Sequence, residues 1–362
     1  MRTLSLAIGL AVLALILVPL GLELWLDARW FTAQGLEAIF FLRLRTQLLL
    51  GLAAGVVTAA FIGLNIGWAT WRLRRAAAKE DQDARALKAM TAAVPAVSAV
   101  LGMFFGLAAF GDWQTVLGFQ AQIPFGQTDP TFGRDIAFYV WTLPLILVAR
   151  GWIVGLLIVG ALATAAIYAI GLMAIEPPLT NAQPYPYILR ERDLAAHPLL
   201  SAAMRHLALF GSALLLVLAG SYWLNNLLLV YSSRGVVFGA SATDMRAVYP
   251  ANLALAGLAV LMALVLLLVA VRPRARNAAG LLTLAGGAGG LWLALAFLLG
   301  EVWPGTYEQF AVHPQQLAAE LPYIQNNIVS TRQAMDLDRI DTRDLQDPGT
   351  LDANILQRDQ DA

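Results

Sequence analysis

Seven long stretches without Asp, Glu, Lys or Arg divide the chain, and polar connections separate them. Each stretch is 20 to 28 residues long, and a helix needs about 20 residues to cross the hydrocarbon core of a bilayer. Because lipid offers no hydrogen-bond partner to a backbone amide, apolar stretches of this length must be helical. The fourth stretch is extended upstream by the apolar run 136–149. The pattern predicts transmembrane helices at residues 3–22, 46–70, 91–111, 143–174, 206–229, 250–271 and 278–300.

Composition agrees with lipid as the solvent for much of the chain. Of the 362 residues 59% are hydrophobic and 13% are charged, whereas soluble domains carry about 25% charged residues. The first apolar run, Leu4–Leu22, is longer than a usual signal-peptide core and no small-x-small cleavage site follows it, so we interpret it as an uncleaved span. The fold class predicted is an all-α polytopic membrane bundle of seven transmembrane helices, with interfacial and extracytoplasmic helical segments.

The positive charges fall mainly on one side of the predicted bundle. The connections 72–88, 176–205 and 272–276, together with Arg2, carry thirteen Lys and Arg residues, whereas the opposite connections carry six. Cytoplasmic loops are the richer ones in membrane proteins. We therefore expect a cytoplasmic amino terminus and an extracytoplasmic segment at residues 301–362, the start of a larger domain. The basic loop 72–88 also predicts attraction to anionic membrane lipids.

The predicted spans contain small residues and few polar ones. Glycines four residues apart let helices approach closely, which predicts a tight bundle. The span centres carry no ionisable side chain, which argues against ion-coupled transport. Arg150, near an outer boundary, is expected to extend to water, with substrate binding as the alternative. Asn65 and Asn252 are expected to form interhelical hydrogen bonds. The glycine pairs are Gly51/Gly55, Gly63/Gly67, Gly102/Gly106, Gly151/Gly155 and Gly286/Gly290.

Polar signatures gather in three segments on the predicted outer side. In residues 129–139, Asp129-Pro130 suggests a helix start, Gly133 a turn and Asp135 a second helix cap. In residues 231–250, Ser241, Thr243 and Asp244 are candidate caps for the sixth span. In residues 313–340, one semi-apolar face recurs at helical spacing, so this helix should pack on another part of the protein; its members are Ile324, Ile328, Thr331 and Met335. The candidate outer-face residues are Asp129, Arg134, Asp135, Tyr139, Arg150, Arg234, Asp244, Asn326, Asn327, Thr331 and Arg332.

Motifs for catalysis or cofactor binding are not evident. His197, His206 and His313 are far apart and belong to no HxxxH or HExxH pattern, and no GxSxG sequence occurs. The absence of cysteine excludes disulfides and thiolate metal sites, and a net charge of zero gives no electrostatic argument for nucleic acid. Asp129, Asp135 and Asp244 could converge on a divalent cation, but caps at three separate helix starts are the interpretation we favour. No catalytic residue, metal site or cofactor is predicted.

The same segments resemble those of a known family. "WFTAQGLEAIFFLRLRTQ", "DPTFGRDIAFYVWTLP", "YSSRGVVFGASATD" and "ELPYIQNNIVSTRQAMDLDRI" are similar to signatures of an uncharacterised family of large bacterial multi-pass membrane proteins, found in cyanobacteria and actinobacteria among others. The resemblance covers almost the whole chain. It implies a seven-span protein of the bacterial plasma membrane, in which a large extracytoplasmic domain follows the spans. It implies no activity, and here the chain stops soon after the "NNIVSTR" segment.

The functional prediction is a membrane anchor or scaffold, leaning away from an enzyme, that presents an extracytoplasmic assembly surface. Its expected partners are membrane lipids and either other envelope proteins or a C-terminal domain of the same protein. Two alternatives stay open. One is a permease or lipid-handling transporter in which Arg134, Arg150 and Arg234 steer an anionic headgroup. The other is the membrane anchor of an envelope enzyme.

Overall fold

A computed structural model describes residues 2–77, 85–175, 198–271 and 278–340, and these residues form helices joined by short connections without a β-strand. The α-helices are α1 (Arg2–Ala33), α2 (Glu37–Ala77), α3 (Arg85–Ala109), α4 (Trp113–Gln120), α5 (Leu143–Ile175), α7 (Pro198–Leu227), α8 (Tyr249–Val271), α9 (Ala278–Phe297), α10 (Trp303–Tyr307) and α11 (Gln316–Ala334). Four π-helical segments extend them, namely η2 (Phe138–Thr142), η4 (Asp244–Val248), η5 (Leu298–Val302) and η6 (Glu308–Val312). The 3-10 turns are η1 (Phe110–Asp112), η3 (Leu228–Tyr231), η7 (His313–Gln315) and η8 (Leu337–Arg339).

Helices of the length and apolarity predicted for membrane spans are confirmed. Six helical stretches among the described residues are long and apolar enough to cross a membrane, and they overlap the second to the seventh predicted spans. The first predicted span, 3–22, lies within α1, a further helix of 32 residues. The described residues are therefore all-α, with six to seven helices long and apolar enough to span a membrane.

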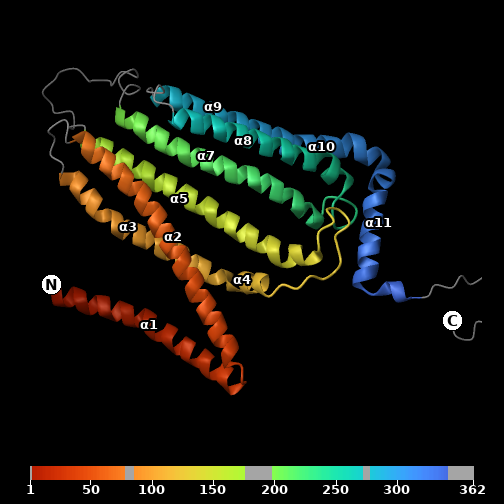
Figure 1. The fold of residues 1–362 in the computed structure, drawn as a ribbon, viewed down its shortest axis with the longest axis horizontal. Coiled ribbons are helices and arrows are strands. Elements are labelled where there is room, and N and C mark those ends of the chain that lie inside the picture. Colours follow the sequence, from red (N-terminus) through yellow and green to blue (C-terminus); the bar gives the residue numbers. More distant parts are fainter. Residues whose placement is uncertain (1, 78–84, 176–197, 272–277, 341–362) are drawn as a thin grey trace, which may run out of the picture.

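The long helices run side by side, and α11 crosses one end of them (Figure 1). Helices α5, α7, α8 and α9 form one group, and α2 with α3 packs beside α5. Helix α1 lies apart from the rest and joins α2 through a turn at Gly35, whose φ is +69°. We call the end that α11 crosses the α11 end of the bundle.

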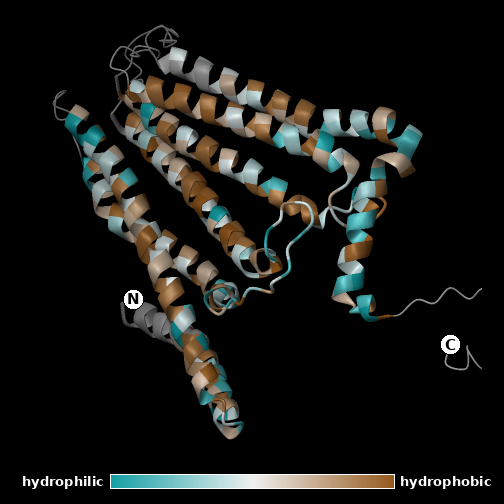
Figure 2. Ribbon diagram, turned by 45° about the vertical axis from the view of Figure 1, so that its right-hand side comes forward, coloured by the Kyte–Doolittle hydropathy of each residue, from teal (hydrophilic) through white to brown (hydrophobic). Residues whose placement is uncertain are grey.

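Hydrophobic residues predominate along the long helices, whereas hydrophilic residues are frequent near the helix ends and along α11 (Figure 2). Leu52, Leu107 and Leu261 are each more than 60% exposed in the protein alone. Exposing this much apolar surface to water would be unfavourable, whereas hydrocarbon tails cover it without cost.

Two glycine pairs bring α2 and α3 into backbone contact. A Cβ atom placed on Gly106 would lie 2.6 Å from the carbonyl oxygen of Gly51, and one on Gly102 would lie 2.6 Å from that of Gly55. The predicted close packing is thus confirmed for these two pairs. It is wrong for Gly286/Gly290, where no described atom lies within 4 Å, because α9 turns these glycines away from its neighbours.

Polar side chains join helices inside the bundle. The predicted interhelical hydrogen bonds are confirmed, since Asn252 Nδ2 donates to Asn226 Oδ1 of α7 (2.8 Å) and Asn65 Oδ1 lies 3.0 Å from His206 Nε2. The other ring nitrogen of His206 lies 3.5 Å from the hydroxyl of Tyr168 on α5. His206 therefore links α7 to both α2 and α5, a structural role that its sequence position alone did not indicate.

Candidate assembly site at the α11 end

Asp129 organises the loop that enters α5. Its carboxylate accepts four hydrogen bonds, two at each oxygen. The donors are the N–H groups of Thr131 (2.9 Å), Phe132 (2.7 Å) and Arg134 (3.0 Å) and the hydroxyl of Tyr139 (2.8 Å). Every oxygen of this side chain is therefore committed to holding the loop and fixing it to the start of the span.

The predicted helix start at Asp129-Pro130 is wrong. The N–H of Gly133 donates to the carbonyl oxygen of Asp129 (3.0 Å), and Gly133 has a φ of +66°. This left-handed conformation, which glycine adopts easily, ends the turn before a helix can form. Asp129 thus caps a turn, and helical structure begins only after Asp135.

Asp135 caps the helix as predicted and also holds the preceding loop. Its Oδ1 accepts the N–H of Ala137 (2.7 Å) inside the helix, and its two oxygens accept the N–H groups of Phe125 (3.1 Å) and Gly126 (3.0 Å). These backbone donors, chiefly Ala137 and Phe125, lower the pKa of the Asp135 carboxyl below its usual range. The side chain therefore stays ionised well below neutral pH.

The candidate arginines of this region have separate partners. The guanidinium of Arg134 lies over the ring of Phe138 (4.5 Å) and near that of Trp223 (5.8 Å). Arg150 Nη1 lies 3.5 Å from Asn225 Oδ1, near the end of α7. The predicted contact of Arg150 with water stays a prediction.

A capping box starts η4 and α8. The Ser241 hydroxyl accepts the N–H of Asp244 (3.1 Å), and Asp244 Oδ2 accepts the N–H (3.1 Å) and the hydroxyl (2.9 Å) of Ser241. Asp244 is 1% exposed, and its other oxygen lies 3.3 Å from Arg234 Nε. Ser241 and Asp244 therefore cap the sixth span as predicted. Thr243 does not, because its hydroxyl donates to Glu308 Oε2.

Helix α11 is attached to the loop before η4 by Asn327, a predicted candidate, and by Glu320, which sequence reasoning missed. Glu320 is 2% exposed, and its two oxygens lie 3.2 and 3.3 Å from the N–H of Ala242. Asn327 Nδ2 donates to the carbonyl oxygen of Phe238 (2.8 Å). Glu320 lies in an otherwise apolar stretch, "LAAELPY". A single acidic residue in an apolar stretch was the sequence signal that could have predicted the burial of Glu320.

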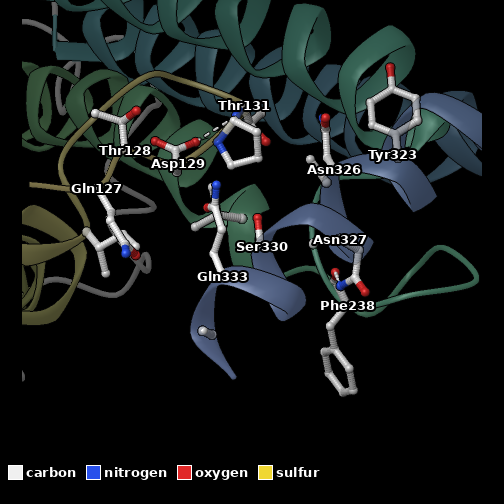
Figure 3. A pocket seen from close by; sticks show the side chains of 16 residues that line it. Gln127, Thr128, Asp129, Thr131, Phe238, Tyr323, Asn326, Asn327, Ser330 and Gln333 are labelled. Atoms are coloured by element: carbon white, nitrogen blue, oxygen red, sulfur yellow. Dashed lines mark hydrogen bonds between the residues drawn. The ribbon is translucent and has the colours of Figure 1, made fainter. Parts of the chain in front are cut away.

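The three signature segments meet around one cavity of about 290 Å³ (Figure 3). Thr128, Asp129 and Thr131 line it from the first segment, and Phe238 to Ala240 from the second. The lining from α11 is mainly uncharged and polar, and it consists of Tyr323, Asn326, Asn327, Ser330, Gln333 and Ala334. The site is therefore suited to hydrogen bonding with a neutral polar group such as a peptide backbone.

The remaining candidates of α11 lie outside this cavity. Thr331 is exposed, and Arg332 Nε pairs with Asp338 Oδ1 at 3.1 Å, with both side chains about half exposed. Arg332 thus makes no described contact with residues 129–139. The predicted face of α11 is also largely uncovered, because Ile328 is 51% and Met335 69% exposed. The helix packs through its other side.

The carboxylates predicted as caps do not converge on a cation. Asp129, Asp135 and Asp244 each hydrogen-bond to residues of their own loop. No group of three or more His, Cys, Asp or Glu residues in the described parts of the chain could hold a metal ion. His313 Nε2 lies 3.5 Å from Glu308 Oε1, and His197 lies outside the described residues.

Comparison with known proteins gives a family without an assigned activity. The family model described as "Uncharacterised protein family (UPF0182)" matches residues 4–362. A UPF0182 protein of Cupriavidus necator is 31% identical over 96% of this chain and 36% of its own length. UPF0182 proteins of Thermobifida fusca and a Synechococcus strain are each 30% identical, over 91% and 99% of this chain and 31% and 39% of their own lengths. The chain thus spans about a third of these relatives. No solved structure matches it.

Proposed function

Because the chain belongs to the UPF0182 family, whose relatives above are much longer than it is, we propose that it is a membrane scaffold. The helices anchor the protein in the bilayer, and α11 with the adjoining loops presents an assembly surface. The occupant of that surface is a protein segment, in the full-length relatives the remainder of the same polypeptide. This role needs no catalytic group in the bundle.

The observation that carries the proposal is the two-sided character of α11. One side is fixed to the loop at 238–242 by Glu320 and Asn327. The other side presents an apolar stripe at helical spacing. Its members are Leu317 (72% exposed), Leu321 (46%), Ile324, Ile328 (51%) and Met335 (69%). A fixed helix with a contiguous apolar stripe is a suitable surface for protein association.

A cross-linking experiment tests this role. In the Cupriavidus necator relative, a photoreactive benzoyl-phenylalanine replaces the residue aligned with Ile328, and adducts are identified by mass spectrometry after irradiation of membranes. The expected adduct joins this position to a peptide outside the region that this chain matches. The residue aligned with Leu261, which is 62% exposed on α8, is the control and should yield lipid adducts alone.

The same measurement separates the scaffold from an interfacial helix. An amphipathic helix that lies in the membrane surface would bury the same stripe among lipid headgroups. If the position aligned with Ile328 gives only lipid adducts, like the control, the scaffold proposal is rejected.

Orientation is part of the proposal. We place the α11 end outside the plasma membrane and the amino terminus in the cytoplasm, because in the sequence most Lys and Arg residues of the connections precede α3, α7 and α9. The chain has no cysteine, so Phe238→Cys and Lys88→Cys each provide a single exposed label site at opposite ends. A membrane-impermeant maleimide should label Phe238→Cys in intact cells and Lys88→Cys only after permeabilisation. The reverse pattern would invert the topology.

The transport alternative has less support. It required Arg134, Arg150 and Arg234 to steer one anionic headgroup. Arg134 stacks on aromatic rings, Arg150 faces Asn225 and Arg234 pairs with Asp244, and none of the three lines the cavity at the α11 end.

A further inference from the structure

A second cavity lies between α2 and α3, at the end of the bundle opposite α11. Its volume is about 480 Å³. Arg74, Arg75 and Trp71 of α2 form its polar side, and Gly67 of α2 with Val94 and Pro95 of α3 form its apolar side. One hollow therefore combines two positive charges with a largely apolar wall.

This cavity sits at the expected depth of the lipid headgroups. Arg74 and Arg75 lie four and five residues after the end of the predicted span 46–70. Trp68 and Trp71 are 51% and 47% exposed, and tryptophan prefers the boundary between headgroups and acyl chains. The guanidinium of Arg75 lies 5.5 Å from the ring centre of Trp71, which restrains its direction.

The wall next to the arginines continues into the hydrocarbon region. Gly67 leaves a shallow depression, because the nearest atom to a Cβ placed there is Val94 Cγ1 at 4.0 Å. Pro95 lies inside α3, and its ring adds apolar surface beside Val94, while Thr70 and Thr91 are the other lining residues. An acyl chain can therefore lie along Gly67, Val94 and Pro95 while its headgroup stays beside the arginines.

We propose that this cavity binds an anionic glycerophospholipid, with the phosphate between Arg74 and Arg75 and the first part of an acyl chain against Gly67 and Val94. Guanidinium groups bind phosphate oxygens through paired hydrogen bonds. A diffuse electrostatic attraction to the membrane surface does not require such paired contacts. A free phosphate ion shares this chemistry but would leave the apolar wall exposed. The lipid satisfies both parts of the cavity.

Native mass spectrometry of the purified chain in neutral detergent, titrated with phosphatidylglycerol, tests the site. The double variant Arg74→Gln/Arg75→Gln should bind the first phosphatidylglycerol roughly thirtyfold more weakly, which corresponds to about 1 kcal/mol for each charge. Lys88→Gln removes a charge from the same end of the molecule, outside the cavity lining, and should change the affinity less than about twofold. Phosphatidylcholine of the same chain length should bind the wild-type chain much more weakly than phosphatidylglycerol.

A variant that keeps both charges covers the case in which the double variant does not fold. Gly67→Leu fills the apolar side of the cavity and should weaken phosphatidylglycerol binding. Inorganic phosphate added as a competitor should have no effect on phosphatidylglycerol binding. Three results would each overturn the proposal: equal affinity for the two lipids, an equal loss in Lys88→Gln, or competition by inorganic phosphate as effective as that of the lipid.

Discussion

Replacement of Asp129 by alanine is expected to lower the free energy of unfolding by about 4 kcal/mol, because four hydrogen-bond donors lose one common acceptor at about 1 kcal/mol each. Three of these donors are backbone N–H groups of a tight loop, and the fourth is the hydroxyl of Tyr139, a residue that is 5% exposed. The measurement is equilibrium unfolding in mixed detergent micelles. Limited proteolysis should also cut the loop at 121–135 faster.

Two variants serve as controls for Asp129. Asp112→Ala removes a carboxylate that makes no capping hydrogen bond at the start of α4, and it should change the free energy of unfolding by less than about 0.5 kcal/mol. Tyr139→Phe removes one of the four donors and should cost about 1 kcal/mol. If Asp129→Ala behaves like Asp112→Ala, the loop is not held by this side chain and the assembly surface loses one of its supports.

Gly106→Leu is expected to destabilise the bundle by about 3 kcal/mol. The added Cβ would lie 2.6 Å from the carbonyl oxygen of Gly51 and 3.4 Å from Gly55 Cα, and both are backbone atoms that a rotamer change cannot move. Helices α2 and α3 must therefore separate, which places the cost at the upper end of that seen for overpacked interiors. The same unfolding measurement in micelles detects it.

Gly257→Leu is the matched control for this interface. Gly257 lies within α8, and no atom is within 4 Å of a Cβ placed there. Leucine forms helices more readily than glycine, so this variant should be neutral or slightly stabilising. Equal destabilisation by both variants would mean that the contact between α2 and α3 does not depend on small residues.

The α2–α3 contact also bears on the proposed lipid site, which lies on the same two helices. The cavity at Arg74 and Val94 requires α2 and α3 to keep a fixed separation, and the glycine contact nearer the α11 end sets it. We therefore expect Gly106→Leu to weaken phosphatidylglycerol binding as well, although Gly106 does not line that cavity.

The spanning helices and several caps followed from local sequence. A charged side chain or an unpaired amide in hydrocarbon is so costly that the stretches without charge mark the spans. Asp135 could be recognised as a cap because its acceptor atoms bond to the residue two positions later. The capping box at Ser241 and Asp244 is equally local, since its partners are three positions apart.

Only the tertiary structure decided how distant segments meet. Glu320 holds the N–H of Ala242 across 78 residues, and neither local spacing nor charge pattern specifies such a pairing. Likewise, apolar residues at helical spacing on α11 indicated a packed face, whereas the structure packs the opposite, more polar side. In lipid, apolar surface does not by itself drive helices together, so small residues and buried hydrogen bonds choose the partners, and these depend on the positions of all neighbouring helices.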